Sequence, residues 1–226
     1  MKFAVHQPNF LPYLGFFDKI RQVDIFVILD DVQFTSPGFT NRNRIKTPTG
    51  SKWLNVPIQG DKKALINQIL VSEDDKWRKS HLTTLKHMYG KSKYYKSLEP
   101  FLLEIYTQNW KYLVDFNFTL LKWCFKLLNI HIDVKFSSSL QITAKTGTER
   151  ILEICKKLDS SEYLSGVTGR KYLNLSRFEK EGIKVSFHEF NHPIYPQRFG
   201  KFISNLSVID YLMNAGPHEF WKENEY

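Results

Sequence analysis

Residues 2–31, KFAVHQPNFLPYLGFFDKIRQVDIFVILDD, contain the pattern that decides the fold class. The apolar run Lys2 to His6 predicts a strand, which ends where a proline removes a backbone donor. Apolar residues at helical spacing then predict a helix over Phe10 to Gln22, with Pro12 in its first turn. Asp24 to Leu29 is almost continuously apolar, as is typical of a buried parallel strand. The right-handed crossover of such a unit brings the ends of both strands to one edge of a parallel sheet.

The rest of the chain continues this alternation around a helical stretch. A polar loop is expected over Thr35 to Gly50, directly after the second strand. Further strands are expected at Trp53–Ile58, Leu65–Val71, Ile132–Phe136, Glu162–Leu164 and Ile183–Glu189, and helices at Lys76–Tyr89, about Ser97–Gln108, about Lys111–Leu128, Thr148–Leu158 and Ser207–Asn214. We therefore expect a single α/β domain over residues 1–226, with a mostly parallel, Rossmann-like sheet and a helical insertion at about 75–130.

Composition narrows the class of protein. With 226 residues, 42% of them hydrophobic and 24% charged, the chain is long enough to bury a core without disulfides. The longest apolar runs, such as Ile25 to Leu29, are far shorter than the ~20 residues that a membrane helix needs. The first residues lead straight into a strand and lack the pattern of a secretory signal, and two cysteines make no disulfide framework. These features predict a soluble, cytoplasmic protein.

The charge indicates the class of partner. A formal net charge of +9 favours anionic partners, such as a nucleotide sugar or an acidic acyl-carrier protein. The basic residues are spread along the chain and do not form one stripe, so we expect no nucleic-acid partner. A lysine-rich surface without a specific partner is the alternative explanation. The aromatic content of 15% predicts an aromatic core and aromatic pocket walls.

The first cluster of candidate site residues follows the first predicted strand. His6 lies at the carboxyl end of that strand, the edge at which open α/β sheets bind ligands. An imidazole there can act as a general base or donate to developing charge. Gln7, Asn9 and Tyr13 follow within ten residues and are candidates for substrate binding. The alternative is a histidine satisfied by neighbouring backbone in a tight proline turn.

A second cluster lies in the polar loop after the second strand. Arg42 and Lys46, beside the amides of Asn41 and Asn43, form a candidate clamp for phosphate or carboxylate. If the strand–helix–strand unit is correct, this loop meets the same sheet edge as His6. A solvated basic loop is the alternative.

Asp30 ends the second strand and is the other candidate catalytic residue. A carboxylate there can bind a ribose hydroxyl, a metal or an amine, and it can accept a proton; a solvated strand end or helix cap is the alternative. No zinc-ligand spacing of His or Cys is present, so we expect no metal site. Further substrate-binding candidates are His81, for which a core histidine is the alternative, Tyr163 and Ser165 before a glycine-bearing turn, and Tyr195 and Gln197 in a late polar loop.

Several blocks of sequence, in order, resemble the WbqC-like protein family. They are HQPNFLPYLGFFDKI (6–20), DIFVILDDVQF (24–34), NRNRIK (41–46), WLNVPI (53–58), YLSG (163–166), YPQ (195–197) and NLSVIDYLMNAGP (205–217). The resemblance implies a bacterial protein encoded among genes for O-antigen or other surface polysaccharides. It implies no particular reaction, and no catalytic residue is carried over from it.

A fainter similarity connects the first turn with nucleotidyltransferases of the HIGH superfamily. It rests on the strand ending at His6, the proline-rich turn, Gly15 and the later Ser165-Gly166-x-x-x-Arg170. Those enzymes use paired histidines near this turn to stabilise attack at an α-phosphate. Phe16 stands where the second histidine would be, so the similarity implies nucleotide binding more than adenylyl transfer.

These observations lead to one expected function and two alternatives. We expect a transferase of O-antigen precursor synthesis that adds an acyl or aminoacyl group to a nucleotide-linked amino sugar. Arg42 and Lys46 would bind the diphosphate, and His6 or Asp30 would remove the amine proton. We expect no bound cofactor; an acyl thioester of acyl-carrier protein or coenzyme A is the candidate donor. A nucleotidyltransferase or ligase of HIGH type and a non-catalytic protein that binds a sugar nucleotide or carrier protein stay open.

Overall fold

A five-stranded parallel sheet lies at the centre of the fold, in a computed structural model that describes residues 1–145, 147–218 and 220–221. Its strands are β1 (Lys2–His6), β2 (Ile25–Ile28), β7 (Asp133–Phe136), β8 (Glu162–Ser165) and β9 (Lys184–Phe187). They lie in the order β7-β2-β1-β8-β9. Numbered along the chain this order is 3-2-1-4-5, as in doubly wound dinucleotide-binding sheets. The predicted α/β, Rossmann-like fold is confirmed.

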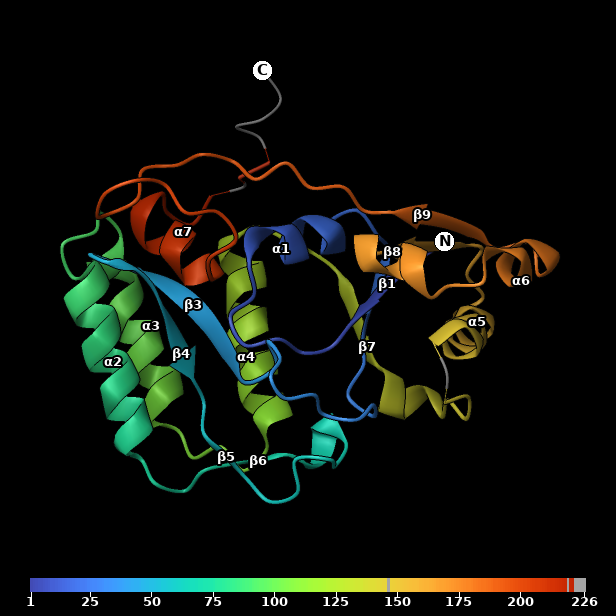
Figure 1. Cartoon of the computed structure of the whole chain (residues 1–226), viewed down its shortest axis with the longest axis horizontal. Coiled ribbons are helices and arrows are strands. Elements are labelled where there is room, and N and C mark those ends of the chain that lie inside the picture. The colour runs from blue at the N-terminus through green and yellow to red at the C-terminus, as the bar shows by residue number, and fades with distance from the viewer. Residues whose placement is uncertain (146, 219, 222–226) are drawn as a thin grey trace.

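Helices cover both faces of this sheet (Figure 1). They are α1 (Leu14–Ile20), α4 (Leu113–Leu127), α5 (Gly147–Leu158) and α6 (Leu175–Lys180). Successive side chains of a strand point to opposite faces. Accordingly Phe26 and Ile28 of β2 belong to the apolar core with α1 and α4, whereas Ile25 and Val27 belong to the core with α5 and α6. The sheet is therefore the middle of three layers.

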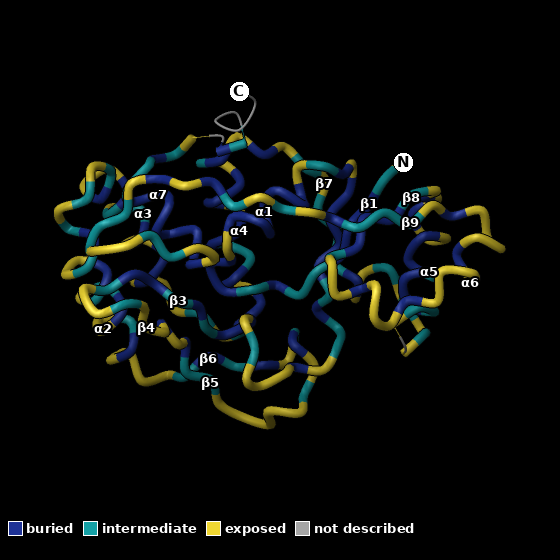
Figure 2. Tube along the Cα trace, turned by 45° about the horizontal axis from the view of Figure 1, so that its top comes forward, coloured by how far each residue is buried: buried dark blue, intermediate teal, exposed yellow. Residues whose placement is uncertain are grey.

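A second group of elements lies beside the sheet. Helices α2 (Lys76–Tyr89) and α3 (Tyr95–Thr107) are at the opposite end of the molecule from α5 and α6 (Figure 1). The other elements are the antiparallel hairpin β3 (Arg42–Thr47) and β4 (Gly50–Asn55), the short pair β5 (Ile58–Gln59) and β6 (Leu70–Val71), the 3₁₀ turns η1 (Ile66–Gln68), η2 (Ser137–Leu140) and η3 (Val167–Lys171), and helix α7 (Val208–Asn214). Figure 2 shows exposed residues gathered in the outer loops around β5 and β6 and around α6.

The first helix is shorter than its apolar spacing predicts. It begins at Leu14, four residues after the predicted start, so Pro12 precedes the helix. Leu11 has a φ of 41°, in the left-handed region that interrupts a helix. The side-chain amide of Asn43 donates to the carbonyls of Phe10 (3.3 Å) and Leu11 (2.7 Å) and so stabilises this turn. The prediction was wrong because a distant residue determines the conformation of this segment.

The basic segment expected in a polar loop is a strand. Arg42–Thr47 pairs in antiparallel register with Gly50–Asn55, and Ile45 is fully buried in the core. The predicted Trp53–Ile58 strand therefore begins earlier and ends earlier, and Leu65–Val71 divides into η1 and β6. The segment has too few apolar residues for a strand pattern, because two of its three buried positions carry the polar side chains of Asn43 and Lys46. Helix α6 had no expected counterpart. No helix in the described part of the chain is long and apolar enough to cross a membrane.

Candidate functional site

Polar residues from all five parallel strands meet at the carboxyl edge of the sheet. His6 ends β1, and Ser165 ends β8. Asp30 follows β2, Ser137 follows β7 and His188 follows β9. Open α/β sheets bind ligands outside this edge, at the point where the strand order reverses. Here that point lies between β1 and β8.

Strands β1 and β8 stop pairing before their carboxyl ends. Strand β1 pairs with β2 up to His6, but it pairs with β8 only at Lys2 and Phe3. The carbonyl of His6 accepts from the amide of Leu29 beside β2, so the alternating carbonyl of Val5 faces β8. Because β8 does not pair there, this carbonyl is left for another donor. We call this region the β1–β8 opening.

Lys19 of α1 supplies that donor. Its Nζ donates to the carbonyl of Val5 at 3.0 Å, and its side chain is almost entirely buried, with 5% of the residue exposed. No ion pair of Lys19 is found among the described residues. The neighbouring Asp18 accepts instead from Nε2 of His188 (2.6 Å) and from Arg21 (2.9 Å). Burial of the ammonium lowers the pKa of Lys19 to about 8.

His6 has a defined tautomer. Its Nδ1 lies 3.0 Å from the carbonyl oxygen of Gln7, which can only accept, so Nδ1 carries the hydrogen and Nε2 holds the lone pair. The half-buried ring packs edge-on against Phe16, 4.9 Å between centroids. Burial, and then the charge of Lys19, lower the pKa of His6 to about 3. The imidazole is therefore neutral at neutral pH, and Nε2 keeps a lone pair that can accept a hydrogen bond.

Asp30 lines an open hollow of about 640 Å³. Its carboxylate accepts from the amide (3.0 Å) and hydroxyl (2.6 Å) of Ser138, from the hydroxyl of Ser137 (3.2 Å) and from the amide of Asn67 (3.4 Å). These contacts hold the carboxylate in place. The hollow is lined by Asp30, Asn67, Gln68, Tyr112, Val114, Asp115, Phe136, Ser138 and Ser139. Hydroxyl, amide and carboxylate groups beside aromatic rings suit a polyhydroxylated ligand.

The side-chain amides of Asn41 and Asn43 donate hydrogen bonds within the chain, mostly to backbone carbonyls. Asn41 donates to the side chain of Asn55 (3.2 Å) and the carbonyl of Val56 (3.0 Å), and Asn43 holds the turn before α1. The guanidinium of Arg42 lies over the ring of Trp53 at 4.3 Å and donates to the carbonyl of Gly38. These contacts stabilise the hairpin and occupy the side chains that were expected to form the anion clamp.

Lys46, Tyr195 and Gln197 belong to a buried network around Asp210, which we call the Asp210 network. Asp210 accepts from the hydroxyls of Tyr89 (2.8 Å) and Tyr195 (2.9 Å) and from the amide of Gln197 (2.8 Å). The ammonium of Lys46 donates to Oε1 of Gln197 (3.2 Å) and to the carbonyl of Lys201. The network joins β3, α2, α7 and the segment before α7, and in this structure it has a packing role.

Two of the other predicted residues lie in the core or contact it. His81 bonds the hydroxyl of Tyr106 (3.3 Å) and the carbonyl of Asn55 (3.1 Å), and burial lowers its pKa to about 4. Tyr163 packs between the rings of Phe3 and Phe178. Neither lines the Asp30 hollow.

The remaining predicted residues lie near the carboxyl edge. Ser165 is buried, and its hydroxyl donates to the carbonyl of Gly166 at 3.1 Å. Gln7 accepts from the hydroxyl of Thr40 (3.2 Å), and the amide of Asn9 bonds the carbonyl of Gln7 (2.9 Å). Tyr13 is exposed beside α1. Its ring packs on Phe190 at 6.0 Å.

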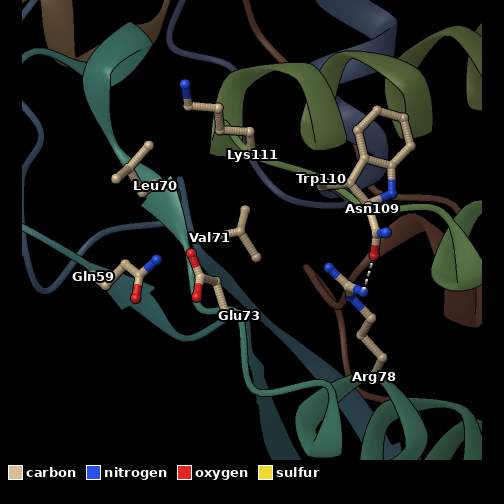
Figure 3. A pocket seen from close by; sticks show the side chains of 8 residues that line it. All are labelled: Gln59, Leu70, Val71, Glu73, Arg78, Asn109, Trp110 and Lys111. Carbon is tan, nitrogen blue, oxygen red and sulfur yellow. Dashed lines mark hydrogen bonds between the residues drawn. The ribbon is translucent and has the colours of Figure 1, made fainter.

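A second hollow lies on the segments 70–73 and 109–111 (Figure 3). Glu73, Arg78 and Lys111 carry its charges, and Arg78 donates to Asn109 at 3.4 Å. None of the residues predicted from the sequence lines it. It shares no lining residue with the Asp30 hollow.

Sequence reasoning missed Lys19, Ser138 and Asn67. The first had a signal: Asp18 and Lys19 are the charged residues of the otherwise apolar segment LGFFDKI, a helix in which every residue is buried. Charged residues inside a fully buried helix need partners or a function. Ser138 and Asn67 are separated from Asp30 by 108 and 37 residues, and only the fold brings them together.

Two comparisons with known proteins found similar sequences over most of the chain. The chain matches the WbqC-like protein family over residues 7–221. It is 32% identical over 224 residues to "Uncharacterized protein Rv1507c" of Mycobacterium tuberculosis (strain ATCC 25618 / H37Rv), covering 95% of this chain and 94% of that protein. No solved structure matches the chain. The chain belongs to the WbqC-like protein family.

Proposed function

We propose that the protein is a transferase that adds an acyl or aminoacyl group to the amino group of a nucleotide-linked sugar. One observation carries the proposal: the unprotonated Nε2 of His6 and the Asp30 hollow lie at the ends of neighbouring strands, at one sheet edge. We propose that this reaction belongs to the synthesis of surface-polysaccharide precursors, because the WbqC-like family is associated with genes for surface polysaccharides. Nucleotide sugars are cytoplasmic, so the proposal also puts the protein there.

The sugar would occupy the hollow. Ser137 and Ser138 hold the carboxylate of Asp30 in place, so its remaining acceptor capacity would receive sugar hydroxyls. The rings of Tyr112 and Phe136 would pack against the apolar face of the sugar. This gives Asp30 a binding role, since its carboxylate already accepts four hydrogen bonds.

His6 would move the proton. The sugar amine attacks the carbonyl carbon of a thioester, so a C–N bond forms and the C–S bond breaks. The proton lost by the amine passes to Nε2 of His6 and then to the departing thiolate, which leaves as a thiol. Nδ1 keeps its hydrogen bond to Gln7 throughout, so the ring does not need to turn.

The test separates binding from catalysis. UDP-linked amino sugars are titrated calorimetrically into the wild-type protein, and N-acylated product is sought by mass spectrometry with acyl-carrier protein and coenzyme A thioesters. His6→Ala should lower kcat about 10²–10⁴-fold and change Kd less than threefold. Asp30→Asn should weaken binding about tenfold. His87→Ala, an exposed histidine on α2, is the matched control and should match the wild type.

Three outcomes would contradict the proposal. Equal losses of rate and affinity in His6→Ala would remove the base role. Binding without any product would make the protein a sugar-nucleotide binder. Release of pyrophosphate from ATP or CTP would indicate nucleotidyl transfer, although the buried Phe16 stands beside His6 where that chemistry would use a second imidazole.

A further inference from the structure

We infer that the β1–β8 opening is a phosphate-binding subsite whose cation is Lys19. The inference deepens the proposed function and rests on it for the identity of the full ligand, because it assigns the place of the nucleotide sugar's diphosphate. The sequence had placed this group on Arg42 and Lys46. Those two cations have other partners, Trp53 and Gln197.

The first argument is the unsatisfied charge. An ammonium group has three donors, and the described residues supply Lys19 with one neutral acceptor, the carbonyl of Val5. No carboxylate of the described residues lies within ion-pair distance of it, and the residue is 95% buried, with 5% exposed. A buried cation without an anionic partner is costly. An anion bound beside it would remove that cost.

The second argument is the place of the charge. Lys19 reaches the carbonyl that faces β8 where β1 and β8 no longer pair, at the reversal of strand order. This is the position where open α/β sheets bind phosphorylated ligands. A neutral hydroxyl or amide would be enough to satisfy the Val5 carbonyl, so that bond alone does not explain a lysine.

The third argument is that Lys19 lies near His6. Lys19 is close enough to His6 for its charge to lower the pKa of the imidazole. A phosphate on Lys19 would therefore lie near the Nε2 that the proposed reaction uses. On the other side of His6, the next strand of the sheet leads to Asp30 and the hollow. Phosphate, proton acceptor and sugar hydroxyl site would follow the order β8, β1, β2.

Inorganic pyrophosphate is the probe, at constant ionic strength. The thermal midpoint and Kd are measured for wild type, Lys19→Met and the control Lys86→Met, which removes an exposed ammonium on α2. Pyrophosphate should stabilise wild type and Lys86→Met, because it binds the folded form. Lys19→Met should bind it at least tenfold more weakly. Equal binding by Lys19→Met and wild type would overturn the inference. Acetate should stabilise far less; an equal effect would indicate a carboxylate site and also overturn it.

A second measurement uses only the wild-type chain. In a ¹³C-labelled sample the Cε signal of Lys19 should move as pyrophosphate is added, and that of Lys86 should not. An unmoved Lys19 signal would overturn the inference even if Lys19→Met did not fold. The probe contains neither sugar nor acyl group. Pyrophosphate binding through Lys19 without sugar-nucleotide binding would contradict the proposed function and leave the subsite intact. Sugar-nucleotide binding without pyrophosphate binding through Lys19 would contradict the subsite and leave the proposed function intact.

Discussion

Lys46 and Lys19 are both buried lysines, but their surroundings differ. Lys46 is 2% exposed and belongs to the Asp210 network, where Gln197 and Lys201 accept from its ammonium. Lys19 is 5% exposed and has the Val5 carbonyl as its one described hydrogen-bond partner. A carboxylate compensates the first region; in the second, the nearest acidic neighbour in sequence, Asp18, is paired with His188 and Arg21.

The difference suggests two reasons for burying a charged side chain: to stabilise the fold and to bind a ligand. A satisfied polar network fixes one packing arrangement, and removing any member leaves the others without partners. A charge buried without compensation lowers stability and is retained where a ligand needs it. The Asp210 network should therefore govern stability, and the β1–β8 opening should govern binding.

Asp210→Ala should have the largest effect on stability. Its removal leaves the hydroxyls of Tyr89 and Tyr195 and the amide of Gln197 without their acceptor, beside the ammonium of Lys46. We expect a loss of about 3–5 kcal/mol in the free energy of unfolding, as for a broken buried ion network. Urea unfolding followed by circular dichroism measures it.

The control for that loss is Asp133→Ala, an exposed aspartate whose removal should cost less than about 0.5 kcal/mol. Asp210→Ala should still bind pyrophosphate like the wild type below its unfolding transition. A small stability loss together with lost binding would reverse the roles of the two regions.

The pH dependence of stability should reveal the cost of burying Lys19. Its pKa is about 8 when folded and 10.5 in the ordinary state, so the unfolded chain holds more protons in between. Stability therefore rises with pH through this window, at about 1.4 kcal/mol per pH unit. Between pH 7 and 9.5 wild type should gain about 2 kcal/mol relative to Lys19→Met. Urea unfolding at both pH values measures this. An equal change in the free energy of unfolding of the two proteins would contradict it.

The fold class was predictable because each strand of the sheet can be recognised from its own short stretch of sequence. Each parallel strand is a short apolar run followed by polar residues, as at Asp24 to Leu29. The start of α1 was not predictable, since Asn43 stabilises the left-handed Leu11 from 32 residues away. The strand β3 was not predictable either, because its polar side chains are buried by other segments and show no apolar alternation.

The candidate site was predictable only where it follows strand ends. His6 and Asp30 could be placed at the sheet edge because a parallel sheet brings the residues after its strands to one edge. Lys19 was missed, since on a sequence basis a charge in a short helix is expected in solvent. Its hydrogen bond to Val5 depends on where the pairing of β1 with β8 ends, and these strands are more than 150 residues apart in sequence. The role of Arg42 and Lys46 depended on a loop that the structure replaces with a hairpin.

Lys46→Met should destabilise the protein more gently than the loss of Asp210. The carbonyl of Lys201 loses its donor, while Gln197 keeps the amide of Ile203 at 2.8 Å. One unsatisfied buried acceptor costs about 1–2 kcal/mol. Lys19→Met, which removes an uncompensated charge, should be neutral or stabilising at pH 7. Chemical denaturation of the two variants side by side tests the opposite signs; a similar loss in both would mean that Lys19 is structural too.

The smallest expected effect is on His6 itself. Burial depresses its pKa most, and the charge of Lys19 adds to that depression. An anion bound to Lys19 would cancel the second cause and leave the first, so the pKa of His6 should rise from about 3 by roughly half to one pH unit. Proton NMR titration of the His6 ring with and without pyrophosphate measures this change, and His81, whose pKa is lowered by burial beside other groups, should not respond. An unchanged His6 pKa in the presence of pyrophosphate would show that the bound anion and the imidazole are not neighbours. The subsite would then have no connection with the proposed proton-transfer step.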